Sequence, residues 1–228
     1  MTREEFKRLV SDAVNDAELK SSDIPAVDLY VDQIIKLHSD RLKEGAERFY
    51  DRQLTKTMIN NYAKDRVITP VKGKKYTKEQ IIQILFVYTL KGTLSIGEIK
   101  RMLDGAYSID GFDGESLVEL YDKYCTTKDN SREYSSVVAE KMLESCGLDI
   151  ENEEDFIAAI INFAAMSAFM KNIAQAMIDE RFPEPEPLEE AEPEKKDKEK
   201  KEKKEKKEKE KKEKKDKKKA EKSAEKSE

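Results

Sequence analysis

The sequence contains only two cysteines, Cys125 and Cys146, and a single histidine, His38. Two cysteines cannot build a disulfide framework or a zinc ribbon, and one histidine leaves little room for imidazole-based metal or acid–base sites. The N-terminal residues MTREEFKRLV lack the apolar stretch of a secretory signal. The uncharged run 156–170 is shorter than the ~20 apolar residues of a transmembrane helix. We therefore expect a cytoplasmic protein with no membrane partner, two buried reduced thiols, and no metal or cofactor.

Charged residues make up 41% of the chain, against roughly 25% in an ordinary globular domain. Much of the surplus lies in residues 183–228, where 19 Lys and 17 acidic residues leave a net charge of +2. Residues 1–182 have an ordinary charged fraction and a net charge of −7. We therefore predict a folded body followed by a low-complexity tail. The tail is expected to be disordered or to form a single helix supported by Glu→Lys pairs four residues apart.

Apolar residues recur through the body at the three- and four-residue spacing of helices. This pattern predicts a mainly α fold with eight helical segments and a small β-hairpin or wing at 69–80. We expect helices within 1–25, at 26–38, from Thr55 to about 65, after the capping boxes Thr77/Gln80 and Ser95/Glu98, at 115–124, at 135–145, and at 153–180.

Positive charge is concentrated between Arg52 and Lys78, where the net charge is +7, while the rest of the body sums to −14. DNA favours such a segment because each neutralised phosphate releases condensed counterions. Asparagine can pair with an adenine edge, and Lys or Arg with guanine or phosphate. We expect one helix to enter the major groove and the following loop to hold phosphates. The base-reading candidates are Lys56, Thr57, Asn60, Asn61 and Lys64, and the phosphate-binding candidates are Arg66, Lys72, Lys74 and Lys75.

Residues 55–103 resemble the winged helix-turn-helix DNA-binding domain of MerR-type regulators. The resemblance rests on Ile59 and Tyr62 in the expected recognition helix, on the run 76–79 after the wing, and on the run 92–100 before the last helix. Two departures stand out, because Asn60-Asn61 replaces an Arg-Tyr pair and Arg66 replaces a glycine. The first helix of the motif would be 26–38, separated from Thr55 by an insertion of about 16 residues.

The run from Asp28 through 54–62 to Lys100 resembles more closely an uncharacterised bacterial family, domain of unknown function eighteen thirty-six. That resemblance extends over most of residues 1–180 and implies a regulatory protein, without naming a ligand or an operator. We therefore expect an N-terminal helix in 1–25, a MerR-like winged-helix domain in 26–104, a helical packing or dimerisation region in 115–182, and the tail 183–228.

The function that these patterns favour is a DNA-binding transcription regulator. Its partner would be double-stranded DNA, and the Ala-rich helix 153–180 offers a surface for a homodimer. The alternative is a helical protein–protein adaptor, in which the basic segment is a solvated helix face and the tail is a solubilising spacer or a tether to RNA. We do not expect an enzyme, because no nucleophile–base pair, metal cluster or phosphate loop stands above chance spacing.

Overall fold

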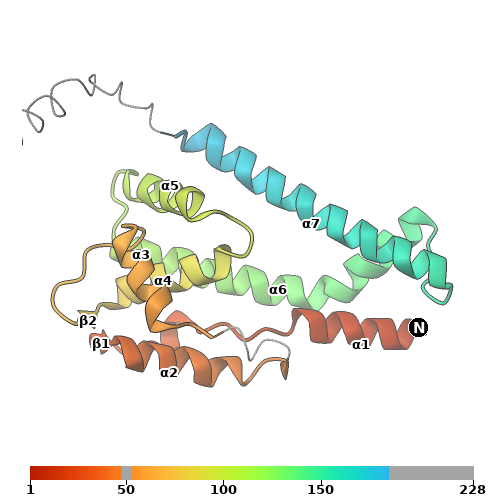
Figure 1. The fold of residues 1–228 in the computed structure, drawn as a ribbon, viewed down its shortest axis with the longest axis horizontal. Helices are drawn as coiled ribbons and strands as arrows, with labels where there is room; N and C mark the ends of the chain where they lie inside the picture. The colour runs from red at the N-terminus through yellow and green to blue at the C-terminus, as the bar shows by residue number, and fades with distance from the viewer. Residues whose placement is uncertain (48–52, 185–228) are drawn as a thin grey trace, which may run out of the picture. The chain divides into compact units, whose positions relative to one another are not determined.

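The computed structural model describes residues 1–47 and 53–184, and this part of the chain is mainly α-helical, as predicted. Arg52 and all but two residues of the expected tail lie outside the described residues. Two short strands accompany the helices (Figure 1). The elements are α1 (Arg3–Val14), β1 (Leu29–Tyr30), α2 (Val31–Leu42), α3 (Lys56–Lys64), β2 (Lys75–Tyr76), α4 (Lys78–Leu90), α5 (Ile96–Tyr107), α6 (Gly114–Cys146) and α7 (Glu153–Arg181).

Helix α4 lies at the centre of the main hydrophobic core. Its side chains are apolar on nearly all sides, and its consecutive residues from Gln80 to Val87 are all buried. A capping box starts the helix, because the Thr77 side chain accepts a hydrogen bond from the backbone of Gln80 and the Gln80 side chain accepts one in return. The surrounding helices contribute Ile34, Ile59, Ile99, Leu117 and Tyr121, which are buried against this core.

The two strands join segments that are distant in the sequence. β1 and β2 are antiparallel, with Leu29 opposite Tyr76 and Tyr30 opposite Lys75. Of the two alternatives for 69–80, the hairpin is therefore wrong, since β2 pairs with the strand that precedes α2 and not with a second strand of the same segment. The wing remains a prediction. Helix α2 consequently begins at Val31 and not at residue 26, because Leu29 and Tyr30 are extended in the sheet.

Helix α6 is a single helix of 33 residues, where the sequence pattern predicted two helices, at 115–124 and 135–145. The intervening polar stretch contains no Gly or Pro to interrupt a helix. Its cations contact the end of α1 and the segment after it. Lys128 forms salt bridges with Asp16 and Glu18, and the Arg132 Nε donates to the Val14 carbonyl at 3.0 Å. α6 ends at Gly147, whose φ of 65° is the left-handed conformation expected of a helix-terminating glycine.

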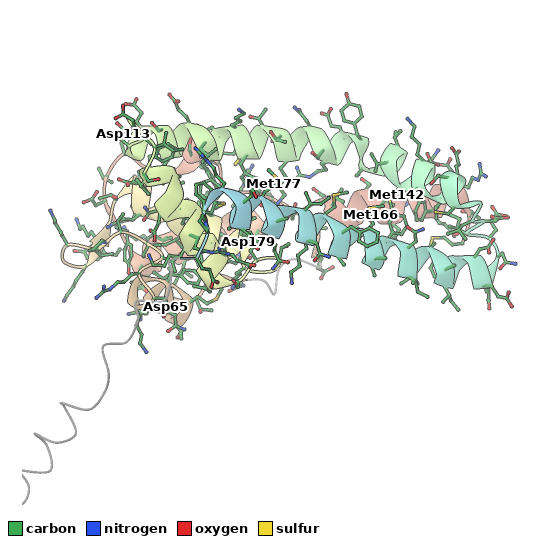
Figure 2. All side chains as sticks on the ribbon, turned by 90° about the horizontal axis from the view of Figure 1, so that it is seen from above. Asp65, Asp113, Met142, Met166, Met177 and Asp179 are labelled. Carbon is green, nitrogen blue, oxygen red and sulfur yellow. The ribbon has the colours of Figure 1, made fainter. Side chains whose placement is uncertain are left out.

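Helix α7 is attached to the body near its two ends. Near its start, Ala159 joins Phe6, Leu143 and Ile150 in a second, smaller core formed with α1 and the end of α6. Near its end, Ile178 joins the main core, and the guanidinium of Arg101 in α5 lies 2.7 Å from the Asp179 carboxylate. Figure 2 shows Met166 and Met177 along this helix and Asp179 near its end.

Candidate nucleic-acid interface

Helix α3 has one buried and one exposed face. Thr55 caps the helix by accepting a hydrogen bond from the Met58 backbone at 3.2 Å. Ile59 and Tyr62 are buried against the core, which fixes the rotation of the helix about its axis. The opposite face carries the five base-reading candidates, all exposed: Lys56, Thr57, Asn60, Asn61 and Lys64. The structure thus brings these predicted residues together on one helical surface.

The backbone at the end of α3 is unusual. Arg66 has a φ of 55°, and it is the only non-glycine residue with positive φ in the part of the chain that the structure describes. The Val67 amide donates to the Tyr62 carbonyl at 3.0 Å, and the Arg66 amide donates to Ala63 at 3.2 Å. This bonding pattern usually ends on a glycine, because left-handed backbone disfavours a β-carbon. Arg66 is exposed despite this constraint.

The loop after α3 leads to β2 and bends away from the helices around it (Figure 1). The phosphate-binding candidates Lys72 and Lys74 in this loop, and Lys75 at the start of β2, are exposed. Gly73 between them has a φ of 84°, a conformation that glycine adopts without strain. The Lys75 ammonium lies 5.1 Å from the centre of the Tyr30 ring in the neighbouring strand, a cation–π distance.

Two buried glutamines hold the base of this loop, and sequence reasoning missed this role. The Gln83 side chain accepts a hydrogen bond from the Thr69 amide at 2.8 Å, and the Gln80 side chain donates to the Pro70 carbonyl at 3.0 Å. Gln83 also donates to the Tyr107 hydroxyl at 2.8 Å, which ties the loop to α5. The available signal was a pair of amides within an otherwise apolar helix, because buried polar groups need partners.

The cations of this surface have no carboxylate partner within the described residues. Elsewhere in residues 1–47 and 53–184, salt bridges join Lys20 to Asp129, Arg101 to Asp179, and Lys128 to Asp16. By contrast, no salt bridge among the described residues involves any of the six cations Lys56, Lys64, Arg66, Lys72, Lys74 and Lys75. Six exposed positive charges on one helix and its loop therefore remain available to an anionic partner.

The histidine and the cysteines lie apart from these residues. His38 is 5% exposed, as the apolar stripe predicted, and burial lowers its pKa to about 4. Cys125 is buried, and burial raises the pKa of its thiol to about 11, so the thiolate is scarce at neutral pH. Cys146 is exposed at the end of α6, which corrects the expectation that both thiols are buried. The described residues contain no cluster of three His, Cys, Asp or Glu side chains able to hold a metal ion.

Comparison with known protein families finds a match for residues 19–124, to the family described as "Domain of unknown function (DUF1836)". The matched segment runs from the residues before β1 into the first third of α6, and so includes α3, its loop and α4. It is shorter than the resemblance over most of residues 1–180 that the sequence suggested, since α1 and α7 fall outside it. No curated protein and no solved structure matches the chain.

Proposed function

We propose that the chain, whose residues 19–124 match the DUF1836 family, is a DNA-binding transcription regulator. In this proposal α3 enters the major groove and the loop between α3 and β2 contacts phosphates. The observation that carries it is the exposed face of α3 and its loop, where six cations without carboxylate partners among the described residues lie together with Asn60 and Asn61.

The order of elements supports the same reading. The MerR-type arrangement requires a helix, a recognition helix, a wing, and two further helices. The elements available for these roles are α2, α3, the loop that leads to β2, α4 and α5. The insertion between α2 and α3 does not separate the two helices in space, because both contribute to the main core through Ile34 and Ile59.

The chemistry of the two parts of the surface suggests different tasks. The side-chain amides of Asn60 and Asn61 each present a donor and an acceptor, which is the pattern that pairs with the N6 and N7 atoms of adenine. The lysines of the loop are flexible point charges and suit contacts with phosphate, which position a protein without reading sequence. The glutamine anchors at Thr69 and Pro70 would hold the loop at a fixed distance from α3.

A selection experiment followed by two substitutions tests the proposal. The full chain is used to enrich a pool of random-sequence duplexes, and the enriched duplex is titrated by fluorescence anisotropy at several salt concentrations. Asn60→Ala should lower affinity for the enriched duplex by ~1–3 kcal/mol and leave affinity for random duplex unchanged. Lys74→Ala should weaken both duplexes alike and reduce the salt slope by about 1.

The matched controls are Asn130→Ala and Lys141→Ala, which replace exposed residues of the same types on α6. Both controls should bind like the wild type, and since every variant retains the lysine-rich tail, the tail's own affinity for nucleic acid cancels. The assignment of the surface is wrong if Asn60→Ala and Lys74→Ala match their controls. If no duplex is enriched at all, the adaptor alternative replaces the DNA-binding one.

A further inference from the structure

Helix α7 exposes an extensive apolar surface. Of its 29 residues only Ala159 and Ile178 are buried. Seven large apolar side chains are each more than half exposed: Ile157, Ile160, Ile161, Phe169, Met170, Ile173 and Met177. At about 100 Å² each they present roughly 700 Å², which exceeds the largest apolar patch of a typical monomer at ≈ 300–600 Å². A soluble chain rarely leaves such a surface in water, so a partner is needed to cover it.

The exposed residues form two neighbouring rows along the helix, each with a spacing of four residues. One row is almost entirely large: Ile157, Ile161, Ala165, Phe169, Ile173 and Met177, all exposed. The adjacent row is mostly small: Ile160, Ala164, Ala168, Asn172 and Ala176, also exposed. Helices pack by fitting such ridges into the grooves of a neighbour. The row of large side chains forms a ridge, and the row of small side chains beside it forms a shallow groove. The ridge of one copy can therefore fit into the groove of a second copy.

Both ends of α7 are held, so this surface is presented in a defined position. Near the start, the rings of Phe163 and Phe6 lie 6.3 Å apart. Near the end, the Gln175 amide donates to the Glu98 carboxylate at 2.6 Å, and the Arg101 guanidinium donates to the Phe182 carbonyl at 3.0 Å. A rigid, pre-ordered surface loses little conformational entropy when it binds.

We infer that the exposed rows of α7 pack against the same rows of a second copy of this chain. The exposed surface of the seven large side chains, together with the alanines of the second row, approaches the roughly 800 Å² per partner of a standard interface. A two-fold arrangement with antiparallel helices fits the charges, because it keeps the acidic first turns, Glu153–Asp155, of the two copies at opposite ends. The interface is distinct from the proposed DNA-binding surface, which lies on α3.

A lipid bilayer is the competing partner, and the charges disfavour it. α7 is long and apolar enough to cross a membrane, and only 6% of its most apolar 18-residue window is buried. However, its first turn carries Glu153, Glu154 and Asp155, which would be repelled by anionic lipid headgroups. Lys171 and Asn172 also interrupt the apolar surface, and both are expensive to place in hydrocarbon.

The test measures the mass of the full chain by sedimentation in the absence of DNA, over a dilution series. The wild type should sediment at twice 26.3 kDa at micromolar concentration. Ile161→Glu and Phe169→Glu should each raise the dimer dissociation constant at least tenfold, because a carboxylate would be buried in the interface. Ile109→Glu is the matched control, since Ile109 is 52% exposed in the loop between α5 and α6, and it should dimerise like the wild type.

The outcomes distinguish a second copy of the chain from a membrane as the partner of α7, and they distinguish dimerisation from DNA binding. Circular dichroism should show unchanged helix content in all three variants, since each substitution is at an exposed position. The inference is overturned if the wild type sediments at 26.3 kDa throughout, or if Phe169→Glu dimerises as well as Ile109→Glu. Flotation of a monomeric wild type with phosphatidylcholine–phosphatidylglycerol vesicles would overturn it in favour of the membrane. Asn60→Ala should remain dimeric, so a failure of DNA binding and a failure of dimerisation are told apart.

Discussion

Replacement of Arg66 by glycine should stabilise the protein and weaken its binding to DNA. The φ of 55° at Arg66 places a β-carbon in a conformation that costs an L-residue roughly 1–2 kcal/mol. Glycine avoids this cost. It also gives the unfolded chain more conformational freedom, which lowers the stability of the folded state by about 0.5–1 kcal/mol and so cancels part of the gain. The expected net gain for Arg66→Gly is therefore ~0.5–1 kcal/mol, or an increase in Tm of roughly 1–4 °C for a chain of this size. Loss of the guanidinium should reduce the salt slope of DNA binding by about 1.

Two measurements on the same variants check this reasoning. Thermal unfolding monitored by circular dichroism gives the change in stability, and anisotropy titration with the enriched duplex gives the change in affinity. Arg66→Ala is the control, because it removes the guanidinium and keeps the β-carbon, so its affinity should fall as in Arg66→Gly while its Tm stays near that of the wild type. A lower Tm for Arg66→Gly would refute the argument from backbone strain. Unchanged affinity in both variants would refute the contact with phosphate.

Two further predictions concern packing and pH. Gly105→Ala should lower stability by ~1–2 kcal/mol in thermal unfolding, because a β-carbon there would lie 2.2 Å from the Phe182 ring. Gly97→Ala in the same helix, whose β-carbon would meet nothing closer than 3.9 Å, should raise stability by about 0.5–1 kcal/mol, and equal gains in both would contradict this packing. Burial lowers the pKa of His38 to about 4 from 6.5, so the unfolded chain takes up its proton first and stability should fall as pH drops from about 6.5 to about 4. In urea titrations, the free energy of unfolding of His38→Phe should fall less than that of the wild type over this pH range, by on the order of 2–3 kcal/mol. Parallel curves of unfolding free energy against pH for the two proteins would exclude this contribution of His38.

Local signals in the sequence are sufficient to predict where the helices around the proposed interface begin. Thr55, Thr77 and Ser95 were expected to start helices, and each caps one in the structure. These motifs are readable because the capping residue and its partner are at most three positions apart. The exposed face of α3 also followed from the spacing of Ile59 and Tyr62, since two buried positions determine which side of a helix faces solvent.

The features that the sequence did not predict depend on contacts between distant segments. The pairing of β1 with β2 joins Leu29 to Tyr76, and no local pattern indicates which strand a two-residue segment will choose. Within α6, Lys128 and Arg132 meet the end of α1 and the segment that follows it, and these contacts lie more than 100 positions apart in the sequence. Similarly, the role of Gln83 as the anchor of Thr69 becomes visible only when the loop lies over α4.

The length of α6 has a consequence for how the protein unfolds. At 33 residues the helix is about 50 Å long, beyond the ~30 Å diameter of a small domain. Leu117 and Tyr121 on its first half belong to the main core, while Ala139 and Leu143 on its second half belong to the smaller core. Unfolding of either core would therefore remove the packing that stabilises one half of this helix. The small core, which has too few side chains to be stable alone, therefore derives its order from the large one, and the two should melt as one cooperative unit.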